Sequence, residues 1–217
     1  IHHALNLKKF QEPLMDDIHL YLKYIRDEGY FIVAYSGTFD PNRGVDLMLD
    51  SFKQSVELDK KIFFVFAGAN EDYSKMIKNY CEYNHLDSNI INYGKIDSSL
   101  IPGILHLSDI CLSFLEDIPA HRISPPQKVI EYFVAGKPVI CNKIEPHEWL
   151  VENRKTGFIL DLDAQQVANA IVILKNDKEL YKYMSENAKQ ESLKYDINIV
   201  YKKMIDEMEN VIKLNTK

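Results

Sequence analysis

One stretch decides the fold: Ser124-Pro125-Pro126-Gln127-Lys128-Val129-Ile130-Glu131-Tyr132-Phe133-Val134-Ala135-Gly136-Lys137-Pro138-Val139-Ile140. It predicts a helix that begins at the prolines and ends at Gly136, followed by a strand. Proline suits the first helical turn, where the backbone N–H has no intrahelical partner, and glycine suits the left-handed residue just past the last turn. Its apolar residues fall on one face by helical spacing and are expected to pack on a sheet. They are Val129, Ile130, Phe133 and Val134.

The other edge of this helix carries charge. Lys128 and Glu131 are three residues apart, one turn above the other. The free N–H groups at a helix start already favour an anion. Pro126 donates no N–H, so the amides of Gln127 and Lys128 are the expected phosphate donors. The pattern predicts a site for a ligand that carries both phosphates and hydroxyls. An amphipathic helix with a solvent ion pair is the ordinary alternative for these spacings alone.

The bulk composition is that of a globular protein. The chain has 217 residues, of which 46% are hydrophobic and 27% charged, enough for one large domain or two small ones. A formal net charge of −6 argues against a nucleic-acid partner, and any phosphate site must use local cations. No apolar run approaches the ~20 residues that span a bilayer. Three widely spaced cysteines indicate buried reduced thiols of a cytosolic protein, without metal-ligand spacing, namely Cys81, Cys111 and Cys141.

Short apolar runs alternate with helical patterns along the chain. We expect buried strands at 31–36, 62–67, 89–93, 109–115, 138–141 and 156–160. This alternation predicts a parallel, doubly wound sheet in a single domain. Ligands of such sheets bind outside the carboxyl ends of the strands. The loops after Ser36, Tyr93 and Leu115 are therefore expected to open beside the helix start at Lys128.

Several helices have recognisable signals. Capping boxes predict helix starts at Asp163 with Gln166 and at Asn176 with Glu179. Helices are also expected over 13–27 and 97–107, where Pro102 fits only the first turn. A helix from about residue 71 should turn five residues inward, namely Tyr73, Met76, Ile77, Tyr80 and Cys81. The last helix, from about 196, carries an apolar stripe from Ile197 to Ile212.

Pro126-x-Lys128-x-x-Glu131-Tyr132, followed by Gly136-Lys137-Pro138-Val139-Ile140, resembles the donor-site motif of family 4 glycosyltransferases (glycosyl transferases group 1). The resemblance implies a Rossmann-like doubly wound parallel sheet, the C-terminal half of the GT-B fold. It implies that Glu131 holds the ribose hydroxyls of a nucleotide sugar and that the helix start receives the diphosphate. A second glutamate usually lies eight positions upstream and contacts the sugar; here that position is Ile123. The sequence around it matches a branch with a Pro-x-Lys-x-x-Glu-Tyr helix start.

The resemblance also assigns the site residues. Arg43 stands where the family has a basic residue that contacts the diphosphate and could fork two phosphate oxygens; a solvated loop arginine is the alternative in isolation. The turn at residues 94–96 is where the family lays its base, although Lys95 could be a plain surface lysine. The expected catalytic residues are Arg43, Lys128 and Glu131. The expected substrate contacts are Gly37, Thr38, Arg43, Gly94, Lys95, Ile96, Pro126, Gln127, Lys128 and Glu131.

The resemblance covers nearly the whole of this chain, but it corresponds to only one half of such an enzyme. Residues 1–217 are expected to form one nucleotide-sugar-binding domain, with 1–12 as interdomain linker and 196–217 as a terminal helix able to contact a missing N-terminal acceptor domain. Ile1 is not a natural start, which suggests upstream sequence. We expect Ile197 to Met204 to pack on this domain, and the part from Met208 to be mobile or held by a neighbouring chain.

The predicted function is donor binding in a retaining glycosyltransferase of cell-envelope polysaccharide biosynthesis, with the fragment alone inactive. The substrate is a nucleotide diphosphate sugar; no cofactor or metal is expected, because the side chains and the helix dipole are expected to handle the charge of the diphosphate. The expected partners are the donor and the acceptor domain, through which any membrane contact would run, and the expected location is the cytoplasm or the inner face of the membrane. Two alternatives stay open: a non-catalytic nucleotide-binding subunit that needs a separate acceptor chain, and a domain like the nucleotide-sugar 2-epimerases. The latter should supply acid-base carboxylates and histidines, and no convincing set is visible.

Overall fold

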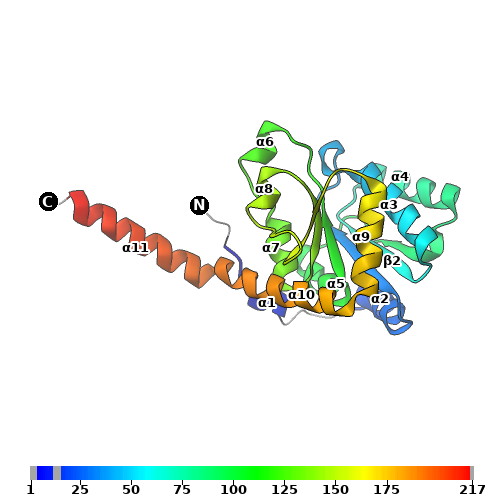
Figure 1. Ribbon diagram of the computed structural model, residues 1–217, viewed down its shortest axis with the longest axis horizontal. Coiled ribbons are helices and arrows are strands. Elements are labelled where there is room, and N and C mark those ends of the chain that lie inside the picture. The colour runs from blue at the N-terminus through cyan, green and yellow to red at the C-terminus, as the bar shows by residue number, and fades with distance from the viewer. Residues whose placement is uncertain (1–3, 12–15, 216–217) are drawn as a thin grey trace.

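A computed structural model describes residues 4–11 and 16–215 of the chain. Six parallel strands form one sheet in the order β3-β2-β1-β4-β5-β6, with helices on both faces (Figure 1). The strands are β1 Phe31–Ser36, β2 Ile62–Ala67, β3 Ile90–Asn92, β4 Ile110–Ser113, β5 Val139–Asn142 and β6 Gly157–Leu160. The predicted doubly wound α/β fold is confirmed.

Helices connect the strands and cover the sheet. The longer ones are α2 Ile18–Asp27, α3 Val45–Leu58, α4 Glu71–Asn84, α5 Ile101–Leu107, α7 Gln127–Val134, α9 Ala164–Asn176, α10 Lys178–Ser192 and α11 Ile197–Asn215. The short ones are α1 Lys8–Gln11, α6 Pro119–Arg122 and α8 Glu145–Glu148, with 3-10 turns at Pro41–Arg43, Asp87–Asn89, Ser98–Leu100 and Leu193–Tyr195.

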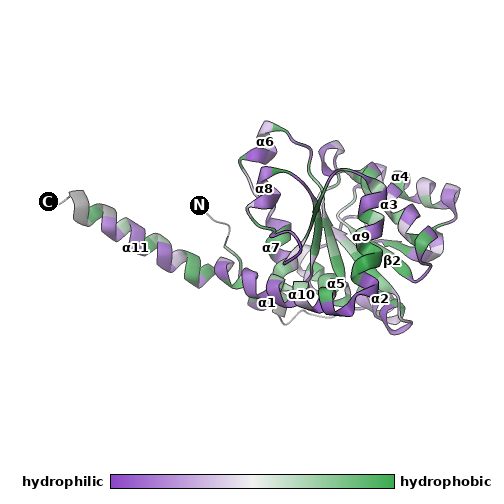
Figure 2. Ribbon diagram, viewed as in Figure 1, coloured by the Kyte–Doolittle hydropathy of each residue, from purple (hydrophilic) through white to green (hydrophobic). Residues whose placement is uncertain are grey.

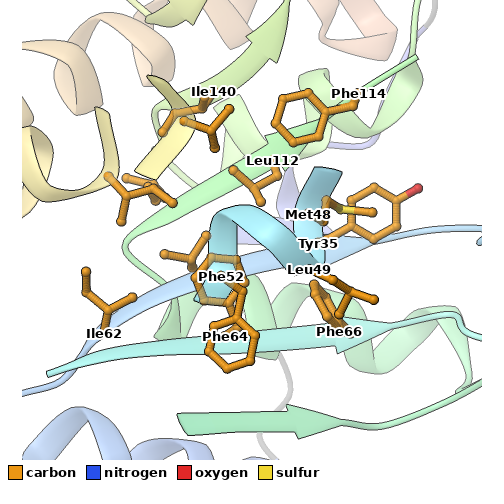
Figure 3. Close-up of a cluster of buried hydrophobic side chains, with 14 of the residues drawn as sticks. Tyr35, Met48, Leu49, Phe52, Ile62, Phe64, Phe66, Leu112, Phe114 and Ile140 are labelled. Carbon is orange, nitrogen blue, oxygen red and sulfur yellow. The ribbon is translucent and has the colours of Figure 1, made fainter. Parts of the chain in front are cut away.

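The sheet is buried on both faces, which is why its strands read as continuous apolar runs. One core packs α3, α4 and α9 against the sheet, and the other packs α2, α5 and α7 against it. Figure 3 shows the first core, where Phe52 of α3 lies over Phe64 of β2. Each such fully buried apolar side chain stabilises the fold by about 1.5–3 kcal/mol.

Helix α7 begins and ends as predicted. Pro126 precedes its first residue, and Gly136 follows its end with a φ of +70°. All four predicted apolar residues of this helix are buried, and Tyr132 is buried with them. The Tyr132 hydroxyl accepts from Ser36 N at 3.1 Å and donates to Ser36 O at 3.2 Å. This contact fixes α7 against the carboxyl end of β1.

One of the two capping predictions needs correction. Asp163 caps α9 through Gln166 N at 2.7 Å, as predicted. The predicted capping box of Asn176 with Glu179 is wrong by one residue, because Asn176 still belongs to α9 and Asp177 caps α10 through Leu180 N at 2.9 Å. The two helices share Asp177 as the end of one and the start of the next.

Further corrections concern the middle of the chain. The helix expected over 97–107 divides into a 3-10 turn and α5, because Pro102 is accepted only in a first turn and a new helix starts beside it. Met76 was predicted to face inward but is 36% exposed, whereas Ile77 and Cys81 are buried. The three cysteines are free and buried, as expected.

Helix α11 projects away from the body of the molecule (Figure 1). Among the residues of α11 whose exposure the structure describes, the last buried one is Val200, and Figure 2 shows green and purple residues alternating along the projecting part. The prediction that packing extends to Met204 is therefore too long, since Met204 is already 38% exposed. Leu5 pairs with the segment before α11 through Leu5 N to Tyr195 O at 2.9 Å and Ile197 N to Leu5 O at 3.0 Å.

Some predictions fall on residues 1–3, 12–15 and 216–217, outside the described ranges. They are the first part of the linker, the start of the helix expected from residue 13, and the end of the terminal helix. Among the described helices, none combines the length and apolar character needed to cross a bilayer.

Candidate nucleotide-sugar site

A cavity of about 790 Å³ opens at the carboxyl edge of the sheet. It is bounded by the loops that follow four adjacent strands and by the start of α7 (Figure 1). Its lining residues are Ile96, Ser98 and Ile101 after β3; Ala67 and Gly68 at the end of β2; Ser36, Gly37, Thr38 and Arg43 at the end of β1; Leu115, Ala120, His121, Ser124 and Pro125 after β4; and Pro126, Gln127, Lys128 and Glu131 at α7. The predicted meeting of loops beside Lys128 is confirmed.

Lys128 reaches from α7 across the end of β1. Its Nζ lies 3.8 Å from the centroid of the Tyr35 ring, and a Cβ at Gly37 would lie 2.8 Å from this Nζ. Gly37 also has a φ of +125°, which L side chains rarely adopt. The backbone conformation therefore favours glycine here, and the lack of a side chain leaves room for the ammonium group.

The ammonium of Lys128 lacks an acceptor. Among the described residues its Nζ makes no hydrogen bond or ion pair, and it lies over the face of the Tyr35 ring. Burial and the positive charge of Arg43 together lower the pKa of Lys128 to about 7, against the opposing charges of Glu131 and Asp40. An anion bound at this point would stabilise the charged lysine and restore its pKa toward the ordinary value.

Arg43 ends a short turn on the loop after β1. Its Nε donates to Asp40 Oδ2 at 3.1 Å, while Asp40 Oδ1 accepts from Asn42 N at 2.9 Å. The chain turns at Gly44, where φ is +63° and a Cβ would lie 2.8 Å from Phe114 Cβ. Among the described residues, the two terminal guanidinium nitrogens of Arg43 have no hydrogen-bond partner. Arg43 is thus held by one nitrogen and can donate two parallel bonds to a ligand.

Glu131 lies one turn beyond Lys128 at the rim of the cavity. It accepts a weak bond from Gln127 Nε2 at 3.4 Å, and burial raises the pKa of its carboxyl group against the opposing charge of Lys128. Within the described residues, Lys128 and Glu131 form no ion pair, so the alternative of an ordinary ion pair on the helix surface is wrong. Glu131 also lines a second cavity of about 710 Å³, which includes Ser98 and Ile101.

Most of the predicted contact residues meet in the first cavity. Eight of them line it: Gly37, Thr38, Arg43, Ile96, Pro126, Gln127, Lys128 and Glu131. Gly94 and Lys95 do not. The Lys95 side chain is exposed, and Gly94 accepts from Gly68 N at 2.6 Å through its carbonyl oxygen. Of the turn expected to contact the base, only Ile96 lines this cavity. The roles of all these residues stay predictions.

Sequence reasoning missed several lining residues. Gly68 had a signal, since it ends the second apolar run; a Cβ there would lie 2.2 Å from Gly37 O, so it lets two loops touch. His121 and Ala120 lie in the short helix α6 after β4, which no recognised sequence signal predicted. Ile123, at the position of the upstream glutamate, is 83% exposed and does not line the cavity.

The described residues hold no group of three or more His, Cys, Asp or Glu side chains arranged for a metal ion. Buried His147 lies beneath the site, with Nε2 3.0 Å from Ser113 Oγ and Nδ1 2.9 Å from Asn142 O. Burial lowers the pKa of His147 to about 4, so it is a neutral structural residue. The expectation that the reaction needs no metal stays a prediction.

The comparisons with known proteins agree on one family. Residues 23–191 match the family described as "Glycosyl transferases group 1". The chain is 22% identical over 187 residues to the "Chitobiosyldiphosphodolichol beta-mannosyltransferase" of Candida albicans, covering 84% of this chain and 39% of that protein. It is 26% identical over 184 residues to the "UDP-Gal:alpha-D-GlcNAc-diphosphoundecaprenol alpha-1,3-galactosyltransferase" of Escherichia coli, covering 83% of this chain and 45% of that protein.

Solved structures agree with this fold. The crystal structure of Anabaena Alr3699/HepE in complex with UDP and glucose superposes with a TM-score of 0.79 at 18% identity, covering 97% of this chain and 56% of that one. The C-terminal domain of the glycosyl transferase group 1 family protein LpcC from Francisella tularensis superposes with a TM-score of 0.72 at 18% identity, covering 89% of this chain and all of that one. The chain spans less than half the length of the two curated relatives.

Proposed function

Since the chain belongs to the glycosyl transferases group 1 family, we propose that it is the donor-binding domain of a glycosyltransferase and takes up a nucleotide diphosphate sugar in the cavity at the start of α7. One observation carries this proposal: Lys128 and Arg43 line the same cavity and have N–H groups that bind nothing else among the described residues. The carboxylate of Glu131 lies one helical turn from Lys128. Phosphates match the cations, and sugar hydroxyls match the carboxylate.

The binding mode follows from the strength of each contact. An exposed helix start contributes only ~0.3–1 kcal/mol to anion binding. Hydrogen bonds from charged groups contribute about 1.5–3 kcal/mol each, so Lys128 and Arg43 would supply most of the attraction for the diphosphate. The ribose hydroxyls would donate to Glu131. During transfer, the same cations would stabilise the negative charge that develops on the departing nucleotide diphosphate.

The relatives suggest which substrates to try. The name of the Escherichia coli relative includes UDP-Gal, and the Anabaena structure contains UDP and glucose. We therefore take UDP as the first probe. Both curated relatives act, by their names, on a saccharide linked through diphosphate to a polyprenyl lipid. A lipid-linked acceptor of this kind is the proposed second substrate, which agrees with a role in envelope polysaccharide synthesis.

The acceptor side would come from a second domain, through which any membrane contact would run. The longer relatives support this division of labour. Because the positioning of two substrates is a large part of catalysis, we expect the chain by itself to bind donor without transferring sugar. The retaining outcome stays a prediction, since the relatives include a β-mannosyltransferase and an α-1,3-galactosyltransferase. The anomeric configuration of the product of the complete enzyme would test it.

Calorimetry with UDP, GDP and ADP tests donor binding. We expect the best of them to bind with a Kd of about 10 μM to 1 mM, which corresponds to −4 to −7 kcal/mol. Glu131→Ala should weaken the ribonucleotide but have little effect on its 2′-deoxy analogue, because the carboxylate then has fewer hydroxyls to hold. Glu82→Ala, on the exposed surface of α4, is the matched control. If Glu131→Ala binds both nucleotides as the unmodified chain does, the ribose assignment is wrong.

A further inference from the structure

The loop between β4 and α7 is held in one shape by its own contacts. Arg122 binds Asp117 with two nitrogens, Nε to Oδ1 at 2.6 Å and Nη2 to Oδ2 at 2.8 Å. Glu116 N donates to Asn42 O at 2.9 Å, which ties this loop to the loop that carries Arg43. The residues on the cavity side of the loop are therefore presented in a defined position.

His121, in the short helix α6 of this segment, has a ring nitrogen that can form a hydrogen bond with a ligand. Its Nδ1 lies 2.8 Å from Glu116 O. A carbonyl oxygen only accepts, so Nδ1 carries a proton and the ring orientation is set by the backbone. Among the described residues Nε2 has no partner, although the side chain lines the cavity. In His147 both ring nitrogens are engaged. His121 thus differs from a structural histidine in having one ring nitrogen left for a ligand.

The order of the strands gives the cavity a direction. The lining residues follow β3, β2, β1 and β4 in turn along the sheet edge, which spans three interstrand steps or about 14 Å. Glu131 belongs to the β3 side, because it shares the second cavity with Ser98 and Ile101. The two cations lie near the end of β1. His121 lies on the β4 side, beyond them.

A nucleotide diphosphate sugar has the same three parts in a row: ribose, diphosphate and sugar. With the ribose at Glu131 and the diphosphate at Lys128 and Arg43, the sugar falls on the β4 side. We propose that His121 binds the transferred sugar by a hydrogen bond between its Nε2 and a sugar hydroxyl group. This inference rests on the proposed donor-binding function and adds the residue that would distinguish a nucleotide sugar from a free nucleotide.

Two substitutions separate the two nitrogens of the ring. His121→Asn keeps a polar group near the position of Nδ1, able to bond Glu116 O, and removes the group at Nε2. His121→Gln restores a polar group near the position of Nε2. His85→Asn is the matched control, because His85 ends α4 with a φ of +57°, a conformation that asparagine accepts. Thermal unfolding of all three variants checks that the fold is kept.

The measurement is the ratio of affinities for UDP-glucose and UDP, or for GDP-mannose and GDP if guanine nucleotides bind better. A lost hydrogen bond to a neutral hydroxyl corresponds to about two- to tenfold in affinity. His121→Asn should weaken the nucleotide sugar by this factor and leave the diphosphate unchanged; His121→Gln should recover part of the loss, and His85→Asn should change neither.

An equal loss for both ligands, or no loss for either, would overturn the assignment of His121 while leaving donor binding intact. If the unmodified chain binds no nucleotide of either kind, the proposed function fails, and the role of His121 fails with it.

Discussion

A lysine stands near each end of α7, buried at Lys137 and half-buried at Lys128, and the two are used differently. Lys137, just past the helix, is 8% exposed and donates to His106 O at 3.1 Å. Burial lowers its pKa and the charge of Asp109 opposes this shift. Lys128, in the first turn, has the ring of Tyr35 beneath it and no oxygen acceptor among the described residues. One lysine has its partner within the fold, while the other lacks one.

The presence or absence of a hydrogen-bond acceptor distinguishes a lysine that serves the structure from one that can bind a ligand. Removing a buried charge from water is costly unless a partner compensates for it. At Lys137 the fold supplies a carbonyl oxygen and a nearby carboxylate. At Lys128 the carboxylates of Glu131 and Asp40 favour the charged form but accept no hydrogen bond from it, and a second cation, Arg43, lies beside the same cavity. Such an arrangement is stabilised when an anion enters. The following predictions test this distinction.

The largest expected effect is on ligand affinity. Lys128→Met should weaken nucleoside diphosphate binding about tenfold to hundredfold, because a hydrogen bond between charged groups is lost. Lys137→Met, the matched substitution at the other end of the helix, should leave affinity unchanged. Calorimetry with the best-binding diphosphate measures both. Equal affinities of the two variants would remove the distinction between the lysines.

The converse effect concerns stability without ligand. Lys137→Met should lower the free energy of unfolding by about 1–3 kcal/mol, because it removes the part-buried hydrogen bond to the carbonyl oxygen of His106. Lys128→Met should lower it by less, or raise it, because a poorly solvated charge is removed. Denaturant unfolding near pH 6.5 gives both values. A larger loss for Lys128→Met would mean that Lys128 is mainly structural.

The third effect is on the pH dependence of binding. Burial lowers the pKa of Lys128 to about 7, so the free protein loses this proton as the pH rises through 7. A bound diphosphate raises the pKa again, so binding above pH 7 takes up a proton. Affinity for UDP-glucose should be level near pH 6 and fall by up to about tenfold per pH unit above 7. Lys128→Arg should abolish this slope, because arginine keeps its charge; a slope that survives would assign the titration to another group.

The smallest expected effect comes from comparing a packed and an exposed apolar residue of α11. Val200 of α11 is packed on the body, whereas Met208 is 64% exposed. Amide hydrogen exchange should be slow up to Val200 and fast beyond it, because the later turns lack packing against the body. Val200→Ala should cost about 0.5–1.5 kcal/mol of unfolding free energy and Met208→Ala almost nothing. Uniformly slow exchange over α11 in the dilute monomer would contradict this picture.

The sequence predicted the parts of the fold that depend on local patterns. The apolar runs at 31–36 and 62–67 are strands with the same bounds, and α7 begins and ends at its proline and glycine signals. The predicted start of α10 was wrong by one residue: Asn176 and Asp177 are adjacent and both suit an N-cap, and the pattern favoured the wrong one. Local signals therefore determine the elements, and their ends only where one residue is much better than its neighbours.

The site was predictable where α7 and the β1 loop carry it. Lys128, Arg43 and Gly37 meet as expected. His121 was not predictable, because its position depends on the Arg122–Asp117 pair and on the bond from the loop to Asn42, neither of which has a periodic signal. Lys95 was misplaced for the same reason: the direction of a loop side chain depends on tertiary contacts.

The most direct test of the donor site is a crystal structure of the chain with UDP, or with whichever diphosphate binds best. We expect phosphate oxygens within hydrogen-bond distance of Lys128 Nζ and of the terminal nitrogens of Arg43, with the ribose hydroxyls at Glu131. A nucleotide seated elsewhere, such as the groove between α3 and α4 beside Lys53 and Tyr80, would contradict the account.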